Sequence, residues 1–394
     1  MTKSVLKPII GSVLLLIALS ALWALTGSPF RKPPRHVILM IGDGMGINSW
    51  VHAHYFRFGA TADSLDDRLV MESLPVTGLA YTHSADRLTT DSAASASALY
   101  TGRKVLNGDL SVAPDGEVLP TVFEEAAREG LAVGLVTTGP VTHATPAAAY
   151  AHVPERNNYH QIFDWLLRTK PDLVLGGGTT ARWRHLPPDF ARRARAAGYT
   201  VCTSAEALQS TRSLPLLGVF GGERLPYEWD WGKDTAALPH LSDLVSAALD
   251  RLGSDPDGFI LMIEGGSIDT ANHDNSLERA VGEVLEFDRC VGLVQEWVKA
   301  HSSWNNALLV VTADHETGEL AVRQPGKPSP RGPAPSFGPG VALPANTFAG
   351  GGYGSDDHSA AVVAVFAQGA GSSDLSGVMD NTRIHKVLRQ AVKP

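Results

Sequence analysis

A short apolar run that ends in a Gly-Asp-Gly turn indicates the fold: Val37-Ile38-Leu39-Met40-Ile41-Gly42-Asp43-Gly44-Met45-Gly46. Such a run is typical of a buried strand bounded by a turn. The turn places Asp43 at the carboxyl end of the predicted strand, which is the edge where open α/β sheets bind ligands. Taken alone, Asp43 could equally belong to an ordinary strand-to-loop turn.

A second stretch supplies a candidate nucleophile, Thr89-Thr90-Asp91-Ser92-Ala93-Ala94-Ser95-Ala96. Ser92 follows an acid and opens a run of small helix-forming residues, so we expect it at a helix start, where free backbone N–H groups favour an anion. A serine hydroxyl is a weak nucleophile and needs a base or a metal ion. The alternative is that Asp91 simply caps an alanine-rich helix.

Three later segments offer metal ligands beside apolar runs. They contain, in chain order, Glu264, Asp269, His273, Asp314, His315 and His358. Asp269 and His273 are four residues apart, so on one helical turn they can share an ion. Mixed carboxylate and imidazole ligands suit Zn²⁺ with an open position, and an all-oxygen set suits Mg²⁺.

From about His36 to the C-terminus, the chain resembles an alkaline phosphatase. The motifs that carry the resemblance occur in the family's order and span residues 41–46, 90–96, 141–148, 264–269 and 313–318, with the segment around His358. The resemblance implies hydrolysis of phosphate monoesters through a phosphoserine on Ser92. The alternatives are a phosphodiesterase of the same superfamily and a secreted phosphate- or metal-binding protein without turnover.

The resemblance also implies two zinc ions and one magnesium ion. The implied ligands are Asp269, His273 and His358 for one zinc, Asp43, Asp314 and His315 for the zinc that activates Ser92, and Asp43, Thr145 and Glu264 for magnesium. Arg156 stands where the family has its phosphate-clamping arginine, and without the resemblance it would be taken for a surface arginine. Asp91, His143 and Thr270 are expected just outside the ligands. Thr270 is a departure, because family members often carry lysine, histidine or tryptophan there.

Alternating strand-like and helix-like segments predict a three-layer α/β/α fold with a large, mostly parallel central sheet. We expect helices at 121–129 and 277–300 and strands at 132–137, 172–175 and 308–311. Residues 31–394 are predicted to form one catalytic domain, with a Pro/Gly-rich active-site loop around 324–352.

The composition and the N-terminal segment bear on the binding partners and the location of the protein. A formal net charge of −8 argues against a nucleic-acid-binding surface, which requires a basic footprint. Residues 1–30 are basic and then apolar, so we expect a signal peptide or an uncleaved membrane anchor, and export to the periplasm or beyond. A homodimer is compatible with the sequence. Cys202 and Cys290 are expected to be two separate buried thiols, and a disulfide between them is the alternative.

Overall fold

The computed structural model describes residues 35–60, 66–178, 186–323, 343 and 345–393. The predicted N-terminal segment 1–30 and residues 324–342 and 344 of the predicted loop lie outside the described residues. The end of that loop contains a strand, Gly350–Gly352, which pairs antiparallel with Ala321–Arg323. None of the helices in the described ranges is both long and apolar enough to cross a bilayer.

Ten strands form one central sheet in the order β14-β2-β13-β8-β1-β7-β3-β4-β6-β5. Their bounds are β1 His36–Gly42, β2 Val76–Tyr81, β3 Ala132–Pro140, β4 Leu173–Gly177, β5 Thr200–Cys202, β6 Leu216–Val219, β7 Phe259–Gly265, β8 Ala307–Ala313, β13 Val363–Gly369 and β14 Gly377–Asp380. Strand β13 is antiparallel to β2 and β8, and every other pairing within the described part of this sheet is parallel. The predicted mostly parallel sheet is confirmed.

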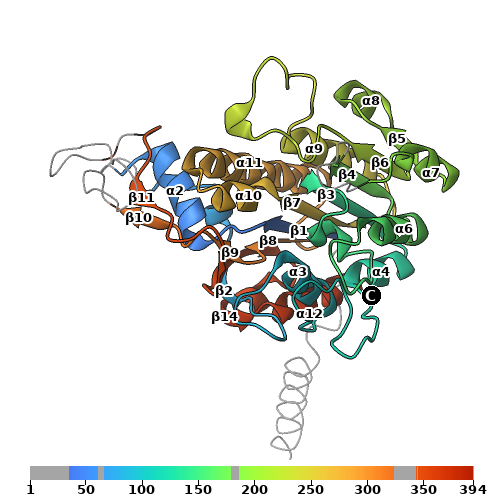
Figure 1. The fold of residues 1–394 in the computed structure, drawn as a ribbon, viewed down its shortest axis with the longest axis horizontal. Coiled ribbons are helices and arrows are strands. Elements are labelled where there is room, and N and C mark those ends of the chain that lie inside the picture. Colours follow the sequence, from blue (N-terminus) through green and yellow to red (C-terminus); the bar gives the residue numbers. More distant parts are fainter. Residues whose placement is uncertain (1–34, 61–65, 179–185, 324–342, 344, 394) are drawn as a thin grey trace, which may run out of the picture.

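Helices cover both faces of the sheet, as Figure 1 shows, with α2, α9 and α11 on one side and α3, α4 and α12 on the other. The helices are α2 Ile47–Phe58, α3 Ser92–Thr101, α4 Val122–Arg128, α5 Ala144–Ala147, α6 Tyr159–Thr169, α7 Phe190–Ala196, α8 Ala205–Ser210, α9 Leu241–Leu252, α10 Ser267–His273, α11 Leu277–His301 and α12 Thr382–Val392. Short 3₁₀ turns lie at Met71–Ser73, Glu228–Asp230 and Ser372–Leu375. A small sheet pairs β9 (Glu316–Thr317) with β12 (His358–Ser359), and another pairs β10 (Ala321–Arg323) with β11 (Gly350–Gly352).

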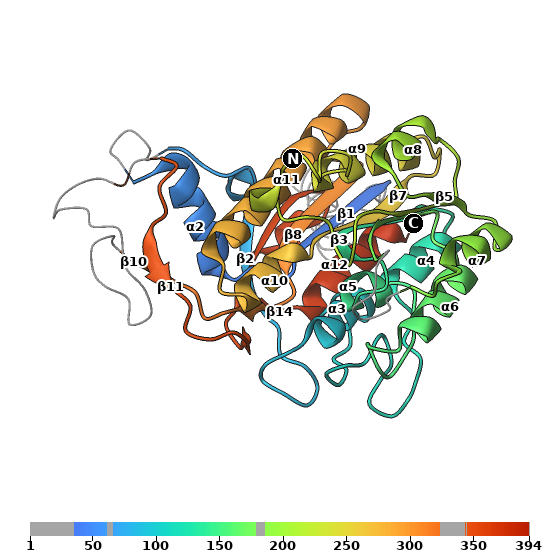
Figure 2. The same cartoon turned by 45° about the horizontal axis from the view of Figure 1, so that its top comes forward.

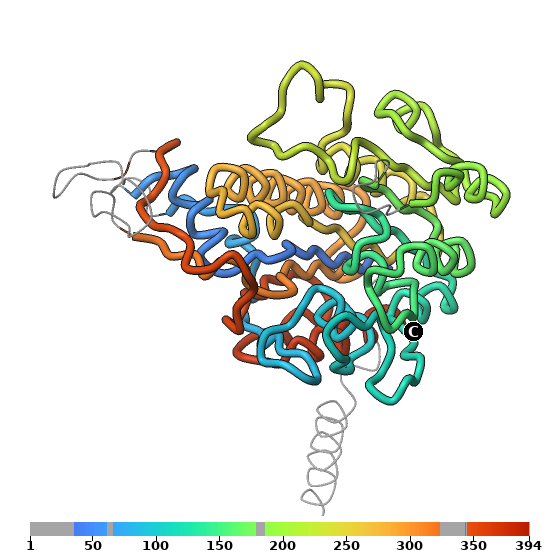
Figure 3. Tube along the Cα trace, in the orientation of Figure 1, coloured from blue at the N-terminus to red at the C-terminus, as the bar shows by residue number. Residues whose placement is uncertain are grey.

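The predicted elements are present with small shifts at their ends. The helices predicted at 121–129 and 277–300 are α4 and α11, and the predicted strands are β3, β4 and β8. Cys202 and Cys290 are both buried and unpaired within the described residues, as expected. Helix α12, near the C-terminus of the chain, packs against α3, which lies in the first third of the chain. Figure 3 shows these distant segments side by side.

Strand β1 occupies the middle of the sheet and determines where the site forms. It pairs in parallel with β7 on one side and β8 on the other, and Gly42 is level with Gly265 and Ala313. Parallel strands end at the same edge, so Asp43, Glu264 and Asp314 meet there although they come from distant parts of the chain. The strand itself is fully buried over residues 37–41. Figure 2 shows β1 between these neighbours from a second direction.

We predict that Thr121 stabilises the fold by capping α4. Its hydroxyl accepts a hydrogen bond from Glu124 N and donates one to the Ala149 carbonyl, while the Glu124 carboxylate accepts from Thr121 N. Thr121→Ala should lower the free energy of unfolding by about 1–2 kcal/mol, measured by urea titration. Thr121→Ser keeps the hydroxyl and serves as the control. Equal losses in the two variants would contradict the capping role.

Candidate functional site

Ser92 is the first residue of α3, the position that the sequence predicts for it. Asp91 caps this helix by accepting a hydrogen bond from Ala94 N at 2.9 Å. The Ser92 hydroxyl is buried, and its Oγ lies 3.3 Å from Nε2 of His315. The open N–H groups and positive end of α3 therefore face the place where Asp43, Glu264 and Asp314 converge.

Each of two acids at this edge is held by one oxygen and leaves its second oxygen open. Asp314 accepts hydrogen bonds through Oδ1 from Gly44 N at 3.1 Å and from His315 N at 3.0 Å. Glu264 accepts a short hydrogen bond from the Thr137 hydroxyl through Oε2. Asp314 Oδ2 and Glu264 Oε1 are buried, and no hydrogen-bond partner reaches them from the described chain. Both oxygens of Asp43 and the hydroxyl of Thr145 are also buried and have no hydrogen-bond partner among the described residues.

The crowding of these carboxylates changes their titration. Burial, together with the charges of Asp314, Asp269 and Glu264, raises the pKa of Asp43 well above its ordinary value. Burial is also the main cause that raises the pKa of Glu264 to about 7 and that of Asp314 to about 6. Buried polar atoms without partners are costly, so this edge of the sheet is suited to bound cations.

His315 joins two groups of candidate ligands. Its Nε2 lies 3.5 Å from Asp43 Oδ1 and 3.3 Å from Asp314 Oδ2, and these three residues form one cluster. Its ring stacks on that of His358, with centroids 3.6 Å apart. Burial and then the charge of His358 lower the pKa of His315 well below its ordinary value, which favours the neutral ring that a metal requires.

A second cluster consists of Asp269, His315 and His358. The predicted third ligand here is His273, and its Nε2 lies 3.3 Å from Asp269 Oδ2 and 3.1 Å from His358 Nε2. The structure therefore brings the predicted set together and adds His315 at its border. The hydrogen bond with Asp269 is the main cause that raises the pKa of His273 to about 9. Binding of a metal there would release that proton.

The third cluster is Asp43, Glu264 and His143. The sequence predicts Thr145 as the third ligand and places His143 just outside. Thr145 is buried in the same region, and its hydroxyl has no hydrogen-bond partner among the described residues. One potential ligand atom of His143 lies within 4.8 Å of one from each of the two acids. Because a four-residue helix, α5, begins one residue after His143, both side chains project from the same turn.

Arg156 is partly buried beside the site, with 19% of its side chain exposed. Its Nη1 donates to Asp91 Oδ2 at 2.9 Å, and its Nη2 lies 3.1 Å from His143 Nε2. Asp91 Oδ2 also accepts a hydrogen bond from Gly108 N. Asp91 therefore caps the Ser92 helix with one oxygen and orients the arginine with the other.

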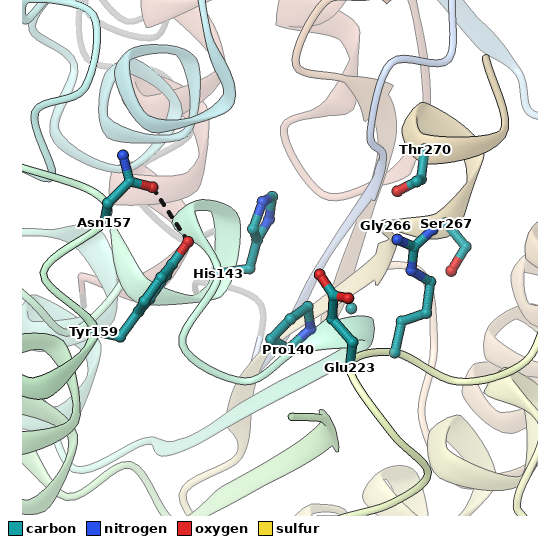
Figure 4. Close-up of a pocket in the computed structure, with 10 residues that line it drawn as sticks. Pro140, His143, Asn157, Tyr159, Glu223, Gly266, Ser267 and Thr270 are labelled. Atoms are coloured by element: carbon teal, nitrogen blue, oxygen red, sulfur yellow. Dashed lines mark hydrogen bonds between the residues drawn. The ribbon is translucent and has the colours of Figure 1, made fainter. Parts of the chain in front are cut away.

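A cavity of about 650 Å³ opens beside these clusters, and Figure 4 shows its lining. The lining residues are Gly139, Pro140, His143, Asn157, Tyr159, Glu223, Arg224, Gly266, Ser267 and Thr270. Thr270 lies on its wall and directly follows Asp269 in the chain. Asn157, Tyr159, Glu223 and Arg224 belong to no spaced motif, and polar side chains outside such motifs carry no recognisable sequence signal.

A polar cluster away from this edge is likewise not indicated by any sequence pattern. His240 Nδ1 lies 2.9 Å from both oxygens of Glu228, and Glu286 accepts a hydrogen bond from Ser242 N at 2.9 Å. Glu283 accepts one from Glu228 N at 2.8 Å. The three glutamates and His240 all take part in hydrogen bonds with the protein. These hydrogen bonds connect α9, α11 and the 3₁₀ turn at Glu228–Asp230.

Comparisons with known proteins agree on one family. The family model for alkaline phosphatase matches residues 34–334. Alkaline phosphatase 4 of Bacillus subtilis is 35% identical over 299 residues, which cover 73% of this chain and 62% of the relative. The aligned region thus spans less than two thirds of that protein. Streptomycin-6-phosphate phosphatase of Streptomyces griseus is 31% identical over 98% of this chain and 96% of its own length.

Solved structures show the same fold. A cold-active alkaline phosphatase from a psychrophilic Shewanella matches with a TM-score of 0.78 and 29% identity, covering 91% of this chain and 100% of that one. A His-to-Asp variant of the alkaline phosphatase from TAB5, whose M3 site holds magnesium, matches with a TM-score of 0.73 and 26% identity, covering 92% of this chain and 98% of the other. The three-layer fold predicted from the sequence is confirmed.

We predict that Glu283 makes stability depend on pH. Burial is the main cause that raises the pKa of this carboxyl from 4.5 to about 8. Between these values the unfolded chain has lost the proton and the folded chain keeps it, so stability falls as pH rises through that window. Glu283→Gln should remove this loss and gain on the order of 2 kcal/mol over wild type at pH 8 relative to pH 5.

The measurement is the free energy of unfolding at several pH values for wild type, Glu283→Gln and Glu296→Gln. Glu296 is exposed on the same helix, so its variant should follow wild type at every pH. A difference between Glu283→Gln and wild type that stays constant with pH would contradict the assignment.

Proposed function

The chain belongs to the alkaline phosphatase family, and on that basis we propose that it hydrolyses phosphate monoesters to an alcohol and inorganic phosphate through a phosphoserine on Ser92. One observation supports this proposal most. A buried serine hydroxyl at a helix start lies 3.3 Å from an imidazole nitrogen of the cluster that contains Asp43 and Asp314. That is the position a nucleophile needs in order to meet a bound phosphate.

The residues at this edge fit the metal ions of the family. The oxygens that lack partners among the described residues belong to Asp43, Thr145, Glu264 and Asp314, and each would be satisfied by a cation. We propose that Asp269, His273 and His358 hold one zinc ion and that Asp43, Asp314 and His315 hold a second. Asp43, Thr145 and Glu264 would hold magnesium, with His143 beside them. The TAB5 variant with magnesium in its M3 site supports an ion of that kind in the family.

Bound cations would lower the pKa of the Ser92 hydroxyl and of water, and would balance negative charge on the phosphoryl oxygens. The chain itself supplies position. Ser92 presents its Oγ for in-line attack, and the N–H groups at the start of α3 favour the dianion. Arg156, held by Asp91, offers its guanidinium to two non-bridging oxygens, an arrangement that lysine cannot reproduce.

The reaction then takes two displacements. In the first, the Ser92 hydroxyl loses its proton, the Ser92 Oγ–P bond forms, the bond from phosphorus to the alcohol oxygen breaks, and the alcohol oxygen gains a proton. In the second, water loses a proton and forms a bond to phosphorus, the Ser92 Oγ–P bond breaks, and Ser92 Oγ regains a proton as inorganic phosphate is released. Each displacement inverts the configuration at phosphorus, so we expect overall retention.

We further propose export of the chain, on the basis of its N-terminal segment.

Replacing the nucleophile tests this proposal. Ser92→Ala should lower the turnover of p-nitrophenyl phosphate by several orders of magnitude while the fold is kept, because the phosphoserine route is lost. Ser97→Ala is the matched control, since Ser97 lies on the same helix and its hydroxyl donates to the Ala93 carbonyl within the helix and to the Asp109 carbonyl outside it. The bis-ester and the sulfate, assayed in parallel, separate a monoesterase from a diesterase and a sulfatase. Trapped phosphoprotein labelled on a residue other than Ser92 would contradict the mechanism.

Removal of metals gives an independent prediction. Exhaustive chelation should abolish activity, and Zn²⁺ with Mg²⁺ should restore it, because the buried acids need cations. Metal analysis of the restored protein should find about two zinc ions per chain, and Asp314→Asn should reduce that content. Full turnover by protein shown to be free of metal would disprove the metal assignment. Unchanged zinc content in Asp314→Asn would disprove the role of that ligand.

A further inference from the structure

Two histidines of the proposed zinc ligands are held through their Nδ1 atoms by backbone carbonyls. His273 Nδ1 lies 2.6 Å from the Asp356 carbonyl, and His358 Nδ1 lies 2.9 Å from the Thr90 carbonyl. A carbonyl oxygen can only accept a hydrogen bond, so Nδ1 of each ring carries a proton. When such a ring is neutral, Nε2 is the nitrogen that is free to bind a metal.

His315 differs, because its Nδ1 is held by a side chain. The partner is the Thr317 hydroxyl, whose Oγ1 lies 3.2 Å from that nitrogen. A hydroxyl can donate or accept, so this contact alone does not decide which nitrogen of the ring carries the proton. The Thr317 hydroxyl, however, donates its one hydrogen to Asp269 Oδ1 at 2.6 Å. It can therefore only accept from His315, which places the proton on Nδ1 and leaves Nε2 free.

The Thr317 hydroxyl thus contacts one proposed ligand of each zinc ion. Asp269 lies in the cluster that includes His358, and His315 lies in the cluster that includes Asp314. One hydrogen-bonded chain runs from the imidazole through the hydroxyl to the carboxylate. A change at Thr317 would therefore reach both clusters at once.

The backbone around Thr317 fixes the position of this hydroxyl. Thr317 is fully buried, and in the small sheet of β9 and β12 it pairs with His358. The turn after β1 passes directly over the hydrogen bond between Thr317 and Asp269. A Cβ at Gly44 would lie 2.5 Å from Asp269 Oδ1 and 2.6 Å from Thr317 Oγ1, and Gly44 has a φ of +63°. Glycine at this position therefore leaves the space that the hydrogen bond occupies.

We infer that Thr317 is a positioning residue that links the two proposed zinc sites, because its hydroxyl orients Asp269 and fixes the ring of His315 with the proton on Nδ1. The inference rests on the proposed function, since it concerns the ligands of the ions proposed there. Hydrogen-bond partners of metal ligands typically contribute roughly 10–100-fold to metal affinity. Loss of the Thr317 hydroxyl should therefore weaken the binding of both zinc ions.

The test measures the affinity of each of the two zinc ions by competition with a chelator. Thr317→Val keeps the shape of the side chain and removes the hydroxyl, so each ion should bind about tenfold more weakly or worse. Thr317→Ser keeps the hydroxyl and should restore both affinities to near those of wild type. Thr312→Val is the matched control, because Thr312 is also buried and its hydroxyl donates to the Ala364 carbonyl at 3.0 Å. Its two zinc affinities should equal those of wild type.

Three results would overturn the inference: unchanged affinities in Thr317→Val, a loss confined to one of the two ions, or an equal loss in Thr317→Ser. If wild type binds two zinc ions and hydrolyses p-nitrophenyl phosphate in those cases, the proposed function stands and only the inference fails. If wild type binds no zinc and hydrolyses no monoester, both fail.

A measurement on wild type tests the position of the proton even if Thr317→Val does not fold. Zinc-loaded protein is prepared with histidine enriched in nitrogen-15, and the His315 signals are identified by their absence in His315→Gln. Nuclear magnetic resonance should show a proton on Nδ1 of His315 that exchanges slowly with solvent, because it is buried and bonded to Thr317. A proton on Nε2 of that ring, or a freely exchanging proton on Nδ1, would overturn the inference.

Discussion

Like charges buried at one edge of the sheet are the constraint on which the rest of the site depends. Asp43, Glu264 and Asp314 are brought together by the register of three parallel strands, and water cannot relieve their repulsion because they are fully buried. The surrounding backbone and Thr137 hold one oxygen of Glu264 and of Asp314 and leave the other unpaired. Cations bound to these open oxygens would relieve the repulsion, and metal binding would then be linked to folding.

The parts of the site that could be predicted from the sequence are those that directly follow apolar strands. In a parallel sheet, strand ends share one edge, so the sequence pattern places Asp43, Glu264 and Asp314 at that edge, and the family resemblance implies how they combine. For Asp91, the helix-cap interpretation and the site-residue interpretation do not exclude each other. The sequence allows it to be a helix cap or a site residue, and it serves as both, with one oxygen for Ala94 N and the other for Arg156.

Features set by loop geometry could not be predicted. His143 and Thr145 come from one short turn, and only the path of that turn decides which of them approaches Asp43 and Glu264. The loop with Glu223 has no periodicity and no spaced ligands. Its position follows from backbone hydrogen bonds to β3 and β4 and from the absence of a side chain at Gly177. These contacts are long-range, and local sequence patterns do not encode them.

The central position of β1 has a consequence for the order in which the chain can fold. Its sheet partners β7 and β8 begin at Phe259 and Ala307, more than two hundred residues further along. During synthesis, an apolar strand therefore remains without neighbours until most of the chain has emerged. Chains with such distant pairings fold slowly, and unpaired apolar strands aggregate. The topology therefore leaves the apolar region of β1 exposed in nascent chains until β7 and β8 have been made.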